Sequence, residues 1–98
     1  MASSKDLGYS QIVALAGPKG LNNGTLGGIP ATADYAVVRA ITQNVRWRSD
    51  GTDPTASVGN LLIAGGDPIV VRRPQLSTIQ FIAAVAGAEL AINFYKTG

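Results

Sequence analysis

The 98-residue chain contains neither cysteine nor histidine. Without cysteine it has no disulfide framework and no thiolate nucleophile. Without histidine it lacks the usual general base, the commonest metal ligand and a side chain that titrates near neutral pH. No serine or threonine can be activated by a histidine, so triad chemistry in its usual form is excluded. We therefore expect a protein that is not an enzyme and that holds no cofactor.

Charge is also scarce, at 14 % of residues against 46 % hydrophobic residues. The net charge of +2, with no run of lysine or arginine, is too small and scattered to indicate nucleic-acid binding. No apolar run reaches the roughly 18 residues that span a membrane, so we expect neither nucleic acid nor membrane as a partner. Such a thinly charged surface suggests that neighbouring proteins cover part of it.

Acidic residues are few, and three of the six adjoin glycine or proline, where aspartate caps a turn. Asp50 and Asp53 are the pair best placed to hold a hard cation. Their segment lacks the alternating ligands and closing glutamate of a calcium loop, so we expect no metal site. The glycine-rich segment 17–28 does not match the spacing of a phosphate loop and is predicted to form turns.

Alternation of apolar and polar residues predicts strands along most of the chain. In the longest run, 34–42, Ala36, Val38 and Ala40 share one face, which suggests a closely packed opposing layer. The pattern continues through 44–48, as two strands with a kink or as one long bent strand crossing between sheets. Further strands are predicted at 10–16, 58–64, 69–72, 78–82 and 90–95.

About six to eight short strands with frequent turn signals and no long helix predict an all-β fold. The expected architecture is a compact β-sandwich or a jelly-roll-like barrel. Residues 1–9 are small and polar and are predicted to be a flexible N-terminal arm, with residues 10–98 as a single β-sandwich domain. The last strand is expected to lie inside a sheet.

Residues 43–57 are the most informative stretch. Alternation puts Val45 and Trp47 on one face of a strand and the two arginines on the other, and Trp47 is predicted to anchor the core. Arg46 and Arg48 are expected to pair with Asp50 and Asp53 and so to order the following loop. Alternatively, they contact a partner protein or a phosphate, because tryptophan and arginine are enriched at interface hot spots.

Arg72 and Arg73 form a second basic pair, which is followed by Pro74 and ends a predicted strand. This arrangement is typical of a solvated edge strand, where charge and proline discourage pairing with another sheet. The candidate residues for interaction or loop ordering are Arg46, Arg48, Asp50, Asp53, Arg72 and Arg73.

Residues 31–95 resemble a family of small bacteriophage virion proteins. The resemblance is carried by the core VRWR-x-DGT-x-PTA-x-x-G at 45–59, together with the alanine-rich strand at 36–40 and the segments at 61–62, 79–82 and 88–95. Residues 1–30 do not contribute to it. The core is fairly specific, whereas its flanks are generic β-sequence.

The resemblance implies a non-enzymatic virion structural protein, of the capsid cement or decoration type, that binds and stabilises the head shell. The alternative is a neck, collar or tail-associated structural protein. Either implies assembly into the virion in the host cytoplasm, with the major capsid protein or other virion proteins as partners, and a homo-oligomer on the particle. Attachment through residues 1–9 or 17–28 is a hypothesis. A free-standing carbohydrate-binding module would need an exposed aromatic platform, which the sequence does not indicate.

Overall fold

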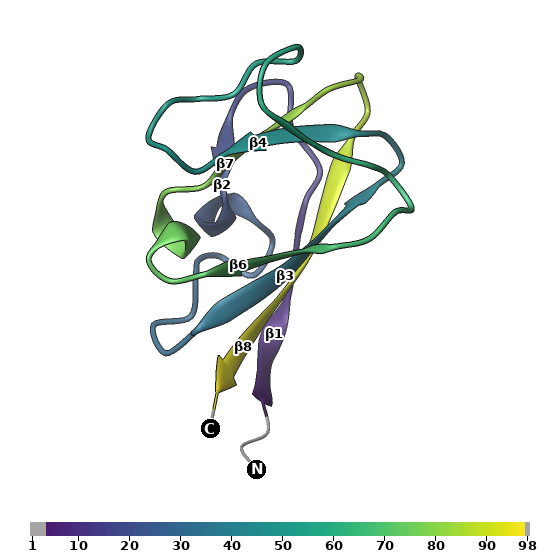
Figure 1. Cartoon of the computed structure of the whole chain (residues 1–98). Coiled ribbons are helices and arrows are strands. Elements are labelled where there is room, and N and C mark those ends of the chain that lie inside the picture. The colour runs from purple at the N-terminus through teal and green to yellow at the C-terminus, as the bar shows by residue number, and fades with distance from the viewer. Residues whose placement is uncertain (1–3, 98) are drawn as a thin grey trace.

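A computed structural model describes residues 4–97, which fold into eight strands and two 3₁₀ turns (Figure 1). In chain order these are β1 (Ser4–Ile12), β2 (Lys19–Gly20), η1 (Leu21–Asn23), β3 (Tyr35–Ile41), β4 (Val45–Arg48), β5 (Asn60–Leu62), β6 (Ile69–Arg72), η2 (Gln75–Ser77), β7 (Gln80–Ala83) and β8 (Glu89–Thr97). One sheet has the order β1-β8-β3-β6 and the other β2-β7-β4-β5. The predicted all-β sandwich is confirmed.

The strand pairings are nested around the middle of the chain. Strand β1 pairs with β8, β2 with β7, β3 with β6 and β4 with β5, all antiparallel. This is the pattern of one long hairpin whose tip is the loop 49–59. Rolling that hairpin up brings β8 beside β3 and β7 beside β4, which completes the two sheets. Eight strands arranged in this way form a jelly roll.

The first strand corrects the predicted N-terminal arm. Residues 4–9 pair with β8, from Ser4 opposite Thr97 to Tyr9 opposite Asn93, so the prediction of a flexible arm is wrong for them. Residues 1–3 lie outside the described residues. The long final strand offers backbone groups for β1 to pair with. Small polar residues are tolerated at the start of β1 because they are exposed, and this end of the strand projects beyond the rest of the fold (Figure 1).

Alternation in β3 and β8 sets the core, as predicted. Ala36 and Val38 in β3 are fully buried, as are Leu90, Ile92 and Phe94 in β8. Their chain neighbours point outward, so one face of this sheet lies against the second sheet and the other is solvated. Strand β8 lies between β1 and β3, which confirms that the last strand is inside a sheet.

The chain crosses between the sheets after β3, which confirms two strands with a kink. Thr42 takes a positive φ of 70°, unusual for a β-branched residue, and its hydroxyl donates to the carbonyl of Gly87 at 2.6 Å. This contact joins the β3–β4 and β7–β8 connections at one end of the sandwich.

Several predicted strands are shorter or shifted. Residues 13–16 lie outside β1, where Leu15 is buried and its carbonyl accepts the N–H of Ala83 at 2.9 Å. The strand predicted at 58–64 is limited to β5. Of the strand predicted at 78–82, the first two residues connect η2 to the strand itself, β7, which begins at residue 80. Where a strand begins and ends depends on where a neighbouring strand offers backbone hydrogen-bond partners. Local alternation in the sequence does not specify this.

Candidate functional site

The loop 49–59 at the tip of the long hairpin is held in part by the predicted ion pair between Arg48 and Asp50. The guanidinium Nε lies 3.0 Å from Oδ1 and Nη2 lies 2.5 Å from Oδ2, so the contact is bidentate. Mainly through these hydrogen bonds, the pKa of Arg48 is raised and the pKa of Asp50 is lowered. Asp50 also accepts the backbone N–H of Thr52. Both side chains are partly open to water, so the pair orders the loop more than it stabilises the fold.

Arg46 corrects the other half of that prediction. Its guanidinium donates to two backbone carbonyls of the loop, of Ala56 at 3.1 Å and of Gly59 at 3.0 Å, and not to a carboxylate. Asp53 is exposed and makes no ion pair within residues 4–97. The reason is geometric: Gly59 lies close against the Arg46 side chain and the Trp47 carbonyl, so loop carbonyls reach the guanidinium first.

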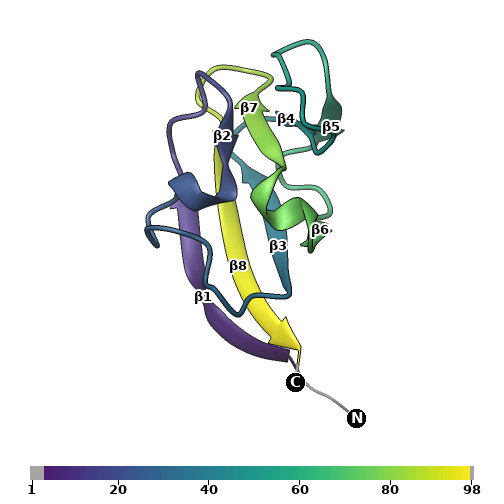
Figure 2. The ribbon, with the colours of Figure 1, turned by 90° about the vertical axis from the view of Figure 1, so that its left-hand side faces the viewer.

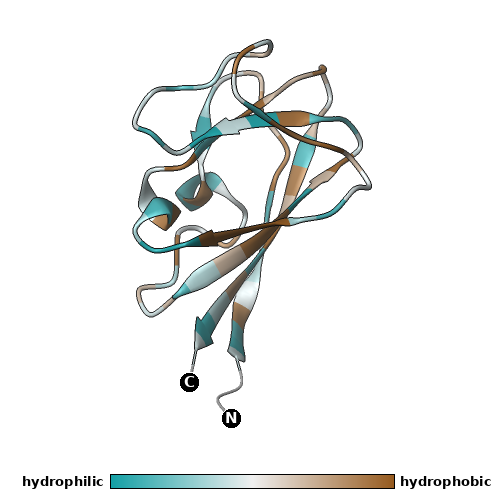
Figure 3. Ribbon diagram, viewed as in Figure 1, coloured by the Kyte–Doolittle hydropathy of each residue, from teal (hydrophilic) through white to brown (hydrophobic). Residues whose placement is uncertain are grey.

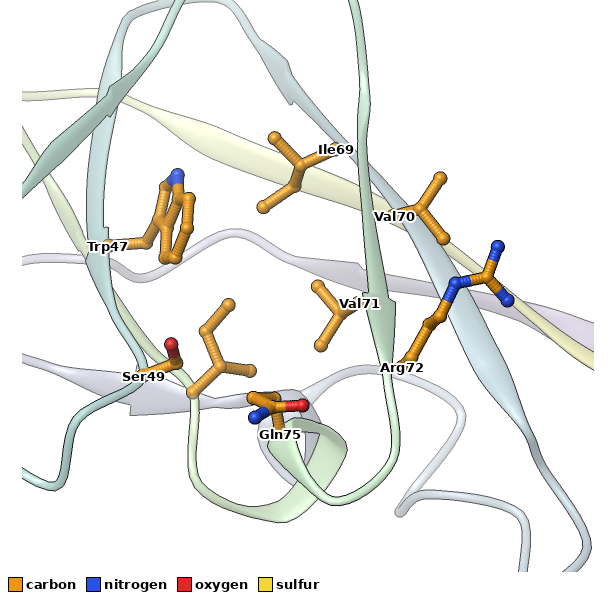
Figure 4. A pocket seen from close by; sticks show the side chains of 8 residues that line it. Trp47, Ser49, Ile69, Val70, Val71, Arg72 and Gln75 are labelled. Atoms are coloured by element: carbon orange, nitrogen blue, oxygen red, sulfur yellow. The ribbon is translucent and has the colours of Figure 1, made fainter.

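Trp47 faces the interior from β4 and is partly buried against the core. Its indole borders an apolar cavity of about 480 Å³ that separates it from β6. Figure 4 shows Trp47 on one wall, facing Ile69 and Val71 on the other. The remaining lining comes from Ser49, Val70, Arg72, Gln75 and Ile79. Trp47 therefore anchors the core with part of its ring and leaves the rest beside an opening.

The cavity lies beside an open edge of the sandwich, because the outer strand β6 provides part of its lining. Strand β5 is the outer strand of one sheet and β6 the outer strand of the other, and the two lie on the same side of the molecule (Figure 2). Four apolar side chains on or beside these strands are about half exposed. They are Val58 (52 %), Leu61 (45 %), Ile63 (52 %) and Val70 (51 %). In Figure 3 the ribbon of β6 is mostly brown, the colour of hydrophobic residues. We call this region, with the cavity, the open side.

The second basic pair lies at the end of β6, on the open edge as predicted. The Arg72 guanidinium lies over the ring of Tyr35, 5.3 Å from its centroid. Arg73 instead turns toward the loop before β3 and donates to the carbonyls of Ala33 at 2.6 Å and Ala31 at 3.0 Å. Arg72 is thus available on the surface, whereas Arg73 has a structural role in fixing that loop.

Sequence reasoning missed the cavity itself. One wall comes from β4 and the other from β6 and the segment around η2, and β4 lies far from these two along the chain. No local pattern predicts that Ile69, Gln75 and Ile79 meet beside Trp47, because their contact depends on which strands end each sheet. The unusual position of the only tryptophan, between two arginines, was the available signal.

The described residues offer an ordered tip loop and exposed apolar side chains. Within residues 4–97, no group of three acidic side chains gathers as a metal ion would need. No helix there is long and apolar enough to cross a membrane. Comparisons with protein-family models, curated proteins and solved structures find no match. The fold and site thus define a class: a small jelly-roll β-sandwich with an ordered tip loop and an apolar open side.

Proposed function

We propose that this chain is a non-enzymatic structural protein of a bacteriophage virion, of the capsid cement or decoration type. It binds the head shell through its open side and so stabilises the particle. The observation that carries the proposal is the open side, which combines the unpaired edges of β5 and β6, four half-exposed apolar side chains on or beside these strands, and an apolar cavity next to β6. Exposed apolar strand edges are suited to contact with another protein chain.

The residues that carry the sequence resemblance also build this side. The core at 45–59 comprises β4 with Trp47, which lines the cavity, and the whole tip loop, which Arg46 and Arg48 hold in shape. A sequence suited to a binding surface would concentrate its specific residues in this way. Jelly rolls recur in viral capsid domains, and also in lectins and cupins, so the fold itself adds only analogy.

The size of the open side supports attachment in many copies. Covering four half-exposed aliphatic side chains contributes about 4 kcal/mol in gross terms, at about 1 kcal/mol each. The loss of translational and rotational freedom on association is at least as large. A single copy would therefore bind weakly through these contacts alone, whereas pairing at a strand edge and contacts between neighbours on a shell add to them.

The abundance of the chain in purified particles tests the proposal. Quantitative mass spectrometry would compare it with the major capsid protein. A ratio near one copy per capsid subunit, or per small group of subunits, is the expected result. A ratio of a few copies per particle would overturn the cement assignment in favour of a neck, collar or tail position. Absence from particles would overturn the virion assignment altogether.

Variants of the open side test the surface. Leu61→Lys and Ile63→Lys place a charge where the shell would cover apolar surface, so binding to particles that lack the chain should be lost. Leu26→Lys is the matched control, because Leu26 is exposed to 41 % and lies beside Ser10 of β1, at the edge of the sheet opposite to β6. Equal binding by all three variants would overturn attachment through the open side.

A further inference from the structure

The outer face of the β1-β8-β3-β6 sheet, which shares Val70 and Arg72 with the open side along β6, carries a different pattern. Its inward face is the core, so its outward residues are those that alternate with the buried ones. All three tyrosines of the chain lie on this outward face: Tyr9 on β1, Tyr35 on β3 and Tyr95 on β8. We call it the tyrosine face. No sequence pattern indicated it, because Tyr9 falls within the predicted arm.

Strand register arranges the tyrosine face in rows across the sheet. The first row runs in the order Arg72, Tyr35, Tyr95, Asp6, and the second in the order Val70, Val37, Asn93, Tyr9. In the first row the two rings stack with their centroids 5.1 Å apart, and the Arg72 guanidinium lies over Tyr35. The Tyr35 hydroxyl donates to the Ser4 hydroxyl at 2.6 Å, which fixes how the ring leans.

Charge divides the tyrosine face into two halves. Arg39 and Arg72 lie on β3 and β6, whereas Asp6 and Glu89 lie on β1 and β8. None of these four groups forms an ion pair within residues 4–97, where the one ion pair is that in the tip loop. Asp6 accepts a hydrogen bond from the backbone N–H of Gly8, and Glu89 accepts one from the side-chain amide of Gln11. Both donors are neutral, so neither carboxylate is paired with a cation in the described part of the chain.

We propose that the tyrosine face binds a second copy of this chain. A two-fold axis parallel to the strands, passing between β3 and β8, would place β6 of one copy over β1 of the other and β3 over β8. Arg72 then faces Asp6 of the partner, and Tyr35 faces the partner's Tyr95, each contact occurring twice. Arg39 comes within one row of the partner's Glu89. The face is self-complementary in charge, which is the requirement for an isologous contact.

A glycan is a less suitable occupant of the tyrosine face. Sugar binding on a sheet uses ring faces that are free for stacking. Here the face of Tyr35 is taken by Arg72 and by the ring of Tyr95, and only Tyr9 stands apart. The extent of the face also fits a dimer of modest strength. Four strands spaced about 4.8 Å apart and seven residues in length give roughly 450 Å² per copy, at the low end for specific interfaces.

A charge-swap experiment tests this dimer, and its outcome does not depend on whether the proposed function is correct. Sedimentation equilibrium at low salt would follow the purified chain up to about 1 mM, where interfaces of this size associate. Arg72→Glu sets two carboxylates against each other at both contacts and should weaken the dimer about tenfold. Asp6→Lys should do the same with two cations. Lys19→Glu and Asp53→Lys carry the same kinds of charge change outside this face and are the controls.

An equimolar mixture of the Arg72→Glu and Asp6→Lys variants is the decisive sample. In the mixed dimer one contact is native and the other joins the two introduced side chains, a carboxylate and an ammonium, so association should return to the native strength. A chain that stays monomeric at about 1 mM overturns the proposal, as does a mixture no stronger than either variant alone. If Asp6→Lys disturbs the turn at Gly8, Asp6→Asn keeps the acceptor while removing the charge, and it should still weaken the dimer.

Discussion

Replacing Gly24 with alanine tests the packing that holds the first strand to the segment after η1. The backbone of Gly24 is extended, with φ −86°, so alanine meets no conformational barrier there. A Cβ at this position would, however, overlap the Ser10 hydroxyl and lie 3.1 Å from the Ser10 Cβ. Ser10 is 1 % exposed and cannot swing into water. Either Ser10 or the segment 24–26 must move.

The magnitude follows from the hydrogen bonds that this movement would break. If only the Ser10 hydroxyl turned away, the bond it accepts from Leu26 N–H at 3.2 Å would be lost, at about 1 kcal/mol. The close Ser10 Cβ shows that rotation is not enough. Displacing the segment also breaks both bonds between Thr25 and Gln11, at 3.0 and 3.1 Å. With the strain of overpacking, we expect a loss of about 2–4 kcal/mol.

Denaturant unfolding followed by Trp47 fluorescence would measure this loss. Gly28→Ala is the matched control, because Gly28 has no atom within 4 Å of the added Cβ, and it should be neutral or stabilising by about 0.4–1 kcal/mol. Adding Ser10→Ala to Gly24→Ala removes the overlapping hydroxyl, so the double variant should be more stable than additivity predicts by about 1 kcal/mol. If Gly24→Ala matched Gly28→Ala, the reasoning about this contact would be refuted.

Three further variants address the core and the tip loop. Phe94→Ala empties a fully buried site, should cost about 3–5 kcal/mol and should leave little folded protein in a thermal melt followed by circular dichroism. Arg46→Met keeps the side-chain stem but loses both bonds to loop carbonyls, so it should cost about 1–2 kcal/mol and speed amide hydrogen exchange in 49–59. Because the folded pKa of Asp50 is depressed, its contribution is present above the ordinary value of 3.8 and is lost as pH falls through the folded pKa. The gap in urea midpoint between the native chain and Asp50→Asn should therefore be constant near neutrality and close in acid; an unchanged gap in acid would contradict the role of the bond to Arg48.

What the sequence predicts well is each strand's own geometry. The small residues Ala36 and Ala40 point to the opposing layer because alternation is a local property that burial on one face imposes. The same reasoning locates β8 and assigns its buried side chains. The pairing of Arg48 with Asp50 was also predictable, since the two lie two positions apart where the strand meets a turn dipeptide.

What the sequence does not predict is pairing over long separations. Strand β1 pairs with β8 across most of the chain's length, from Ser4 to Thr97, and no local pattern marks residues 4–9 as a strand. Arg46 was assigned a carboxylate because charges are visible in a sequence, whereas carbonyls, which every residue carries, are not. The cavity beside Trp47 and the tyrosine face both depend on strand order, which alternation leaves undetermined.

The nested strand pairing explains why residues 45–59 influence so much of the structure. Residues 45–59 form β4 and the tip of the long hairpin, so every other strand pair is built outward from them. In a simple hairpin the conformation of the tip loop would be free to vary. Here two arginines from β4 fix it by hydrogen bonds to a backbone carbonyl and to a carboxylate of the loop. Holding the tip also fixes β5, whose edge bounds the open side. A change in the loop would therefore alter the open side before it altered the core, so the proposed attachment and the stability of the fold should respond to different substitutions.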